Sequence, residues 1–349
     1  MIQLKSIKLE NIADLRKALQ TAIELEHATI PPYLTANFTL YNTGNDQISD
    51  LIGSILGEEM LHLSIACNIL NAVGGSPVLN KPGFIPRYPG PLPGGVETGL
   101  QVPIQKFSKE LVHDVFMVIE EPENPIEIKA SLDKAEGLTI GQFYTNIKSL
   151  ITSLEAEAKA NGKTIFTGNV NEQMTYEQFY PSSLLFKIVD EGTALRGIDI
   201  IIDQGEGTST DPFVSEDDDA GHEEPAHYYR FQEIFLGKTL LKNPNGGFMF
   251  GDPEIPFNPE KIPNMWPNPK MDDYPKDSQA YINSKFFNYN YTSLLNCLHQ
   301  TFNGQPDKIN TAMGIMFSLR LYALKLLAIP DPVHPGYVAG PSFEYVIAE

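Results

Sequence analysis

Acidic and histidine side chains recur in this chain at a spacing that is typical of metal coordination. The pattern Glu-x-x-His occurs four times in the 349 residues. On a helix, residues three positions apart lie on one face, so a carboxylate and an imidazole can reach the same ion. Because the pattern also arises by chance, the position of each pair on its helix decides whether it indicates a metal site. The four pairs are Glu24/His27, Glu59/His62, Glu110/His113 and Glu224/His227.

One pair lies on the apolar face of a helical hairpin near the N-terminus. The apolar periodicity predicts helices over residues 11–43 and 47–73, joined by a short turn. Glu26 interrupts the apolar stripe of the first helix, and Glu59 and His62 interrupt that of the second. Burying a carboxylate is costly unless a cation or a proton compensates. Glu26 and His62 are equidistant from the turn, so the three side chains should lie at one height and form a metal site.

A second helical hairpin repeats the same order of residue types. Helices are predicted over residues 182–206 and 220–237, on either side of an acidic loop. Glu224 and His227 form the Glu-x-x-His pair of the second of these helices. This repetition predicts that the two hairpins face each other and contribute matching halves of one centre.

The third helix of this arrangement offers two carboxylates on its apolar face. Glu191 and Glu206 lie about 22 Å apart along a helix, so only one of them can serve. Pro225 is expected near the start of its helix, which places Glu224 close to the connecting loop. A partner at the other end of that loop favours Glu206, and Glu191 is the alternative.

The two hairpins together predict a carboxylate-bridged centre of two metal ions inside a four-helix bundle. Carboxylate and imidazole ligands suit iron, and manganese is an alternative. The predicted ligands are Glu26, Glu59, His62, Glu206, Glu224 and His227.

Two further Glu-x-x-His pairs and one glutamate are interpreted as structural. Glu24 lies off the apolar stripe, so Glu24/His27 is expected to be a surface pair or to support the ligands. Glu110/His113 opens a short helix that has no partner hairpin. Glu120 ends that helix and is interpreted as a cap rather than a ligand.

The remaining segments predict an all-α fold with long connections. Residues 75–107 and 241–278 are rich in Pro and Gly and are predicted as loops. We expect a bundle in residues 1–240, with an inserted segment near 75–180, and a loop with a C-terminal helical hairpin in 241–349. Pro31 and Pro32 should kink or interrupt the first helix. The other predicted helices cover 108–121, 139–161, 279–302 and 306–328.

Composition excludes several classes of function. The chain has 44 acidic and 25 basic residues and a formal net charge of −19, which disfavours nucleic acid and anionic membranes as partners. Two cysteines, Cys67 and Cys297, exclude a disulfide scaffold and a cysteine-based metal cluster. Residues 1–5 lack the apolar stretch of a secretory signal, and no run is long enough for a membrane span. A cytoplasmic protein is therefore expected.

Several longer segments that surround these residues resemble one known family. They are residues 23–34 (IELEHATIPPYL), 58–62 (EEMLH), 88–93 (YPGPLP), 204–207 (QGEG), 227–231 (HYYRF) and 339–344 (AGPSFE). The chain resembles the ferritin-like domain of the iminophenyl-pyruvate dimer synthase family, through residues 1 to about 240 and again near the C-terminus. The pathway enzymes of that family are far longer, so the resemblance covers only their ferritin-like part.

The resemblance implies an activity as well as a fold. Family members in the violacein and rebeccamycin pathways couple two imine molecules made from an aromatic amino acid. For this chain the resemblance implies a ferritin-like four-helix bundle, non-haem iron and oxidative coupling, and it supports the six predicted ligands. We therefore expect a di-iron oxidoreductase of secondary metabolism, with O₂ and a small aromatic amino-acid-derived imine or a related molecule as substrates.

Two non-catalytic alternatives stay open. A metal-storage protein must pack into a shell, and the Pro-rich segments 75–107 and 241–278 would obstruct that packing. A scaffold protein with a vestigial site would bind metal without substrate turnover. The sequence leaves the oligomeric state open, a homo-oligomer included.

Overall fold

A computed structural model of the chain describes residues 10–126, 138–178, 183–215 and 223–346. Long helices dominate these residues: α1 (Ile12–Leu40), α2 (Asp46–Ala72), α5 (Ile140–Ala160), α6 (Glu191–Glu206), α7 (His227–Leu236), α8 (Gln279–Thr301) and α9 (Ile309–Leu327). A shorter helical segment consists of α3 (Lys109–Leu111), the π-helical turn η4 (Val112–Phe116) and α4 (Met117–Ile119). Single 3₁₀ turns are η2 (Pro82–Phe84), η3 (Pro93–Gly95), η5 (Val170–Glu172), η6 (Pro259–Lys261), η7 (Met271–Asp273) and η8 (Pro306–Lys308).

Two small antiparallel hairpins are the named strands of the described chain. Strand β1 (Phe213–Ser215) pairs with β2 (Glu223–Pro225), and β3 (Lys238–Lys242) pairs with β4 (Phe248–Glu254). The β3–β4 pair follows α7, and most of it lies in the segment 241–278 that the sequence predicts as loop. The all-α fold class is confirmed, with these short strands as additions.

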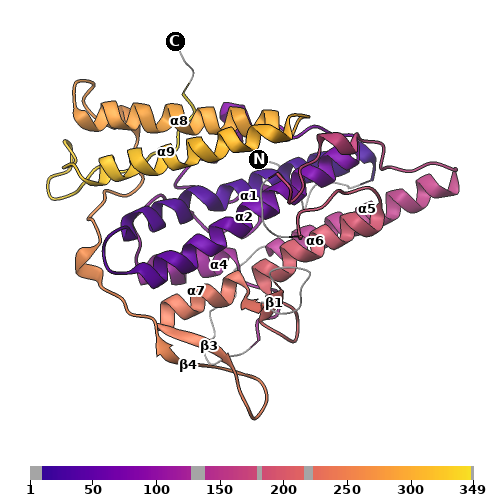
Figure 1. Cartoon of the computed structure of the whole chain (residues 1–349), viewed down its shortest axis with the longest axis horizontal. Helices are drawn as coiled ribbons and strands as arrows, with labels where there is room; N and C mark the ends of the chain where they lie inside the picture. Colours follow the sequence, from indigo (N-terminus) through magenta and orange to yellow (C-terminus); the bar gives the residue numbers. More distant parts are fainter. Residues whose placement is uncertain (1–9, 127–137, 179–182, 216–222, 347–349) are drawn as a thin grey trace.

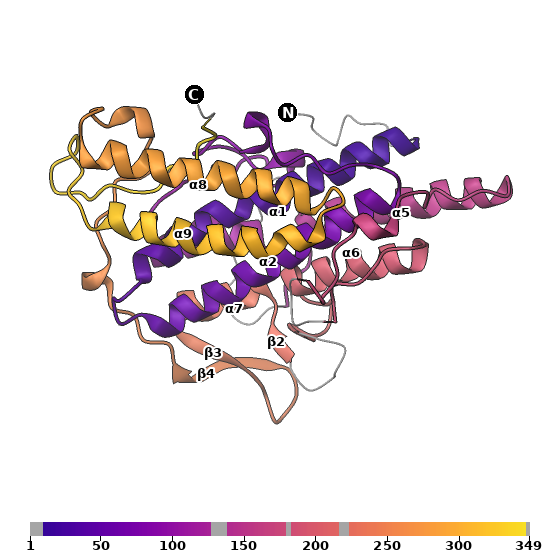
Figure 2. The same cartoon turned by 45° about the horizontal axis from the view of Figure 1, so that its top comes forward.

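The hairpin of α1 and α2 forms the middle layer of the molecule (Figures 1 and 2). One face of this hairpin is covered by α5, α6, α7 and the short helices. The hairpin of α8 and α9 lies on the opposite side, as both views show. The middle layer therefore has two covered faces, and each can hold a site.

Helix α1 continues through Pro31 and Pro32, where the sequence predicts a kink or an interruption. Pro32 has no N–H to donate to the carbonyl of Ala28, four residues earlier. The hydroxyl of Tyr88 donates to that carbonyl oxygen instead, at 2.7 Å. A side chain from the connecting loop thus replaces a backbone donor and stabilises the helix next to Glu26.

Helices α6 and α7 both start later than their periodicity predicts. Asp190 caps α6, since its side chain accepts from the backbone N–H of Thr193 at 2.8 Å. Helix α7 starts at His227 because the residues before Ala226 are paired as strand β2. This later start changes the geometry of the second Glu-x-x-His pair.

The described residues do not test two of the predictions. The division of the chain near residue 240 stays a prediction. Residues 1–5, on which the expected absence of a secretory signal rests, lie outside the described ranges. Within those ranges, no helix combines the length and the apolar character that crossing a membrane requires.

Candidate metal centre

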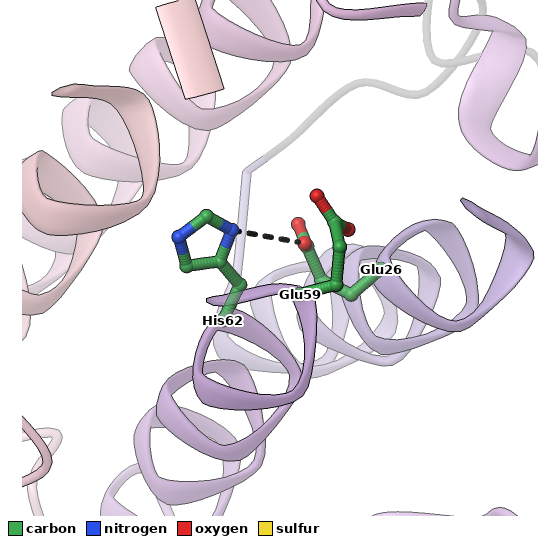
Figure 3. A group of neighbouring side chains, drawn as sticks. All are labelled: Glu26, Glu59 and His62. Carbon is green, nitrogen blue, oxygen red and sulfur yellow. Dashed lines mark ion pairs between the residues drawn. The ribbon is translucent and has the colours of Figure 1, made fainter. Parts of the chain in front are cut away.

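Three carboxylates and two imidazoles meet on the inner face of the α1–α2 hairpin. Glu26, Glu59 and His62 form one group, in which the candidate ligand atoms lie within 4.8 Å of one another. Figure 3 shows these side chains converging from α1 and α2. Glu59, Glu120 and His227 form a second group by the same criterion. Glu59 belongs to both groups, so it lies where a bridging carboxylate would lie.

The cluster is removed from solvent, since none of these five side chains is more than 4% exposed. His62 Nδ1 lies 3.6 Å from Glu26 Oε2. His227 Nδ1 lies 3.0 Å from Glu59 Oε1 and 3.5 Å from Glu120 Oε2. Two donors that bind one ion at about 2.1 Å lie roughly 3.0–3.4 Å apart at ordinary ligand angles. The separation of His227 from Glu59, 3.0 Å, lies in this range, and the separations of 3.5 and 3.6 Å lie just above it.

Hydrogen bonds to Nε2 leave the Nδ1 atom of both histidines available for a metal. His227 Nε2 lies 3.0 Å from Glu58 Oε2, and His62 Nε2 lies 2.9 Å from Gln204 Oε1. A carboxylate and an amide oxygen only accept, so each Nε2 carries a proton, and in the neutral imidazole the lone pair is then on Nδ1. His227 Nδ1 lacks a hydrogen bond of ordinary geometry among the described residues, although Glu59 Oε1 lies 3.0 Å away, so the two atoms can act together as ligands.

Each carboxylate of the cluster has one oxygen held by a hydroxyl group. Tyr144 donates to Glu26 Oε1 at 2.5 Å, and Tyr33 donates to Glu120 Oε1 at 2.6 Å. Thr29 donates to Glu59 Oε2 at 2.6 Å. The other oxygen of each carboxylate is the one that faces an imidazole. This division of roles orients a set of oxygen and nitrogen donors toward two common points.

Glu58 supports the cluster through a buried ion pair with Arg230. The Arg230 guanidinium donates from Nη1 and Nη2 to the two carboxylate oxygens, at 2.6 and 2.9 Å. Burial would raise the pKa of Glu58, but the charges of Arg230 and His227 outweigh it and lower the pKa to about 2. Glu58 thus stays ionised and holds the imidazole of His227 in one orientation.

The charges inside the cluster are unbalanced without a cation. Burial and the neighbouring charge of Glu120 raise the pKa of Glu59 to about 7. Burial opposes the charged form of His62, yet the hydrogen bond and charge of Glu26 raise its pKa. Acidic residues near one another compete for protons, and bound cations would displace those protons. The residues present therefore fit a metal centre.

Glu224 does not reach this cluster, and its predicted helical placement is wrong. It lies in strand β2, its side chain is 48% exposed, and it pairs with Arg230 Nη1 at 3.4 Å. The three-residue spacing brings two side chains to one face only inside a helix. Because α7 begins at His227, only the histidine of this pair joins the cluster.

Neither carboxylate proposed for α6 joins the cluster. Glu206 Oε1 accepts from the backbone N–H of Gly141 at 2.6 Å, at the start of α5. A Cβ atom on Gly141 would lie 2.5 Å from Glu206 Oε2, so the carboxylate occupies the space of a side chain there. Glu191 is the first residue of α6 and pairs with Lys159 at 3.1 Å. Gln204, two residues before Glu206, makes the contact with His62.

Glu120 is the third carboxylate of the cluster, the role that the sequence analysis assigned to Glu206. It directly follows α4, after the π-helical turn η4. The extra residue in such a turn changes which side chain faces inward, so α-helical periodicity is a weaker guide there. One signal was available: Val112, Phe116 and Glu120 are spaced by four, which places an acidic residue on an apolar stripe. The cap interpretation missed this signal.

The other two Glu-x-x-His pairs form no cluster with their own glutamates. His113 Nδ1 lies 2.7 Å from Asp114 Oδ1. His27 is buried rather than part of a surface pair, and its Nε2 contacts the hydroxyl of Tyr291. Both pairs are thus absent from the metal centre, as expected, and the burial of His27 excludes the surface alternative for the first pair.

Comparison with known proteins identifies the fold family. A family model described as ferritin-like matches residues 19–236, which is more than half of the chain. A crystal structure of a ferritin-like protein from Caulobacter vibrioides is similar over 97% of this chain and 99% of that chain, with a TM-score of 0.60. The two sequences are 21% identical, so this likeness shows the fold alone. No curated protein matches the sequence. The match over residues 19–236 shows that the chain belongs to the ferritin-like family.

Proposed function

We propose that the cluster binds two metal ions and that the protein is a di-iron oxidoreductase. Glu26, Glu59 and His62 would hold one ion, and Glu59, Glu120 and His227 would hold the other. The observation that carries this proposal is the state of both histidines, whose Nδ1 atoms face carboxylates while Nε2 is held elsewhere. Carboxylate oxygen and imidazole nitrogen suit iron, and manganese fits the same donors.

The proposed reaction is an oxidation of a small molecule by O₂. When bound, a pair of reduced iron ions supplies the electrons and the binding position for O₂. The resemblance of the segments around the ligands favours a small aromatic amino-acid-derived imine or a related molecule as substrate, in secondary metabolism.

The chain itself contributes orientation, exclusion of water and control of charge. Burial keeps bulk water from the carboxylates and strengthens every interaction among them. The hydroxyls of Tyr144 and Tyr33 fix one oxygen of Glu26 and of Glu120, so the second oxygen cannot rotate away. Glu59, whose pKa is raised to about 7, is partly protonated near neutral pH, and an arriving cation would displace that proton.

A non-catalytic metal-binding protein is the second candidate. Deep burial of all the ligand side chains favours it, because a substrate must reach the centre while a stored or structural ion need not. The two candidates differ in their response to O₂, since a loaded enzyme oxidises a second molecule and a loaded scaffold does not.

The test starts with anaerobic reconstitution of the metal-free protein with Fe(II), followed by elemental analysis. We expect two iron ions per chain, and Glu224→Gln is the matched control that should also bind two. The loaded protein then receives O₂ with and without an aromatic imine. Substrate-dependent O₂ consumption supports the oxidoreductase, and iron that accumulates beyond two ions per chain supports storage. Two ions without any O₂ consumption would reject the enzyme and leave the scaffold.

A further inference from the structure

A cavity of about 580 Å³ lies on the face of the α1–α2 hairpin that α8 and α9 cover. Ligand pockets for small molecules commonly measure about 300–1,000 Å³, so this cavity has the size of a binding site. The residues that line it include none of the carboxylates or histidines of the metal cluster. The cavity is thus separate from the centre proposed to react with O₂.

The cavity is elongated along the helices that form its walls. Its lining on α9 runs from Ile309 to Arg320, which is about 16 Å at the rise of an α-helix. On α2 it runs from Ser49 to Ser64, about 22 Å by the same measure. The lining between these ends is mostly apolar and includes Leu34, Leu56, Leu63, Leu295, Met313 and Met316. This shape and this lining fit a chain-like apolar molecule.

The uncharged polar side chains of the lining are paired within the protein. Asn37 Nδ2 donates to the backbone carbonyl of Ser49 at 2.8 Å, and the Ser49 hydroxyl donates to Asn37 Oδ1 at 3.2 Å. Ser64 donates to a backbone carbonyl of its own helix at 2.8 Å. The hydroxyl of Tyr291 contacts His27. These groups bond to one another rather than to a ligand, so the walls offer a ligand mainly apolar contacts.

One acidic and one basic side chain, Asp50 and Arg320, belong to the lining, and both are exposed. They lie at the same end of the cavity, since the α1–α2 turn and the C-terminal end of α9 are on one side of the molecule in Figures 1 and 2. The guanidinium of Arg320 lies over the ring of Tyr41, 4.4 Å from its centroid, and has no ion-pair partner among the described residues. Stacking uses the face of a guanidinium and leaves the N–H groups at its edge available for a carboxylate.

Apolar surface continues from the cavity to the outside at this end. Phe317 lines the cavity and is 69% exposed. Leu321, one turn further along α9, is 53% exposed. Exposed apolar side chains that adjoin a cavity are typical of the entrance to a binding site for an apolar ligand. Arg320 lies between these two residues in sequence and thus marks the mouth of the cavity.

The α8–α9 hairpin is basic, although the chain as a whole has a formal net charge of −19. This local charge favours an anionic group at the mouth, whereas the exposed carboxylate of Asp50 stays hydrated on the α2 side. Residues 279–327 contain one acidic residue, Asp307, and four basic residues, Lys285, Lys308, Arg320 and Lys325.

We propose that this cavity binds one molecule of a linear amphiphile, whose unbranched apolar chain fills the cavity and whose carboxylate pairs with Arg320 at the mouth. A fatty acid has this chemistry. The inference does not rest on the metal centre, because no residue of the cluster lines the cavity.

The test is isothermal titration calorimetry of the full chain with decanoate, 1-decanol and decylammonium, which share one chain and differ in the charge of the head group. Non-specific attraction to a protein of net charge −19 would favour the cation and disfavour the anion. We expect the opposite order: decanoate binds at one molecule per chain, about 3–5-fold more tightly than decanol, as an exposed ion pair allows. Decylammonium should bind most weakly.

Shortening the chain tests the apolar part of the site. Each buried methylene changes affinity about 3–4-fold, so octanoate should bind roughly 10-fold more weakly than decanoate. Metal-free and iron-loaded protein should give the same affinities, because the cavity and the cluster share no residue.

Three variants locate the ligand. Arg320→Met keeps an unbranched apolar stem, so decanoate should lose its advantage over decanol while decanol binding is unchanged. Lys325→Met is the matched control, since it removes a cation of α9 that does not line the cavity and should leave decanoate binding unchanged. Gly53→Phe should obstruct the cavity and weaken both ligands at least 10-fold. A Cβ atom at Gly53 would meet only Asn37 Nδ2, at 3.8 Å, so the backbone tolerates a side chain. Thermal melts check that each variant is folded.

Four results would overturn the proposal. Equal affinity for decanoate and decanol, or tightest binding of decylammonium, would mean that Arg320 does not select the head group. Equal losses in Arg320→Met and Lys325→Met would reduce the effect to general electrostatics. Unchanged binding in Gly53→Phe would place the ligand elsewhere. Binding of decanoate by the iron-loaded form alone would place the carboxylate on the metal. The titrations of metal-free protein do not depend on the metal centre, so failure there leaves the proposed oxidoreductase untouched.

Discussion

The two Glu-x-x-His pairs of the helical hairpins share a spacing but not a geometry. Glu59 and His62 lie in the middle of the 27-residue helix α2, so both side chains enter the cluster. Glu224 lies in a strand and His227 begins a helix, so only the histidine enters. A spacing motif thus predicts shared coordination only where one continuous helix carries both residues. Substitutions in the two pairs can therefore test which of their residues bind metal.

The largest effect on metal binding is expected at the carboxylate that both groups share. Glu59→Gln keeps the shape of the side chain but removes the charge that would bridge two ions. We expect the iron content to fall from two ions per chain to well below one. Glu224→Gln is the matched control, and its iron content should be unchanged because the residue lies outside the cluster. Equal losses of iron in both variants would mean that Glu224 is also a ligand, as the sequence predicts.

A smaller effect on metal is expected at Glu120. Glu120→Gln should remove one ion and leave the other on Glu26, Glu59 and His62. Glu206→Gln should retain both ions, because its carboxylate binds the backbone of Gly141. Isothermal titration of the metal-free variants with Fe(II) under anaerobic conditions measures both stoichiometries. If Glu206→Gln loses an ion and Glu120→Gln does not, the assignment of the third carboxylate is wrong.

Arg230, the buried cation next to His227, should affect the free energy of unfolding more than it affects the number of bound metal ions. Arg230→Met leaves Glu58 buried without its partner, and breaking such a pair costs about 3–5 kcal/mol of the free energy of unfolding. Lys148→Met removes a cation from an exposed pair with Asp199, where the loss should be about 0–1 kcal/mol. Chemical denaturation of the metal-free proteins gives both values. A loss below about 1 kcal/mol in Arg230→Met would show that Glu58 is stabilised by other groups.

The smallest expected effect is the pH dependence of the metal-free protein. The pKa of Glu59 is raised to about 7 from an unfolded value of about 4.3, so its favourable contribution is full below pH 4.3 and is lost toward pH 7. The raised pKa of His62 acts in the same direction. The melting temperature of metal-free protein should therefore fall from pH 5 to pH 7 relative to loaded protein. Parallel curves for the two forms over this range would contradict a buried acidic cluster.

Periodicity was enough to predict the half of the site that is built on regular helices. Glu26, Glu59 and His62 interrupt apolar stripes, and counting from the turn put Glu26 level with His62, in agreement with their 3.6 Å contact. These inferences need only the rise and twist of a helix and the cost of a buried charge.

The other half depends on irregular backbone, which periodicity does not encode. The π-helical turn before Glu120 and the strand that contains Glu224 each change the direction of a critical side chain. The supporting contacts are also long-range, since Tyr144 and Tyr33 reach their carboxylates across 118 and 87 residues of sequence. The contact of His27 with Tyr291 could not be predicted either, because Tyr291 lies in the C-terminal hairpin.

The central claim is that two ions lie in one buried cluster with Glu59 between them. Anomalous scattering at the iron edge from crystals of the reconstituted protein tests it most directly. We expect two peaks about 3.5–4 Å apart, one beside Glu26 and His62 and the other beside Glu120 and His227. A single peak, or a peak beside Glu206 or Glu224, would contradict this claim.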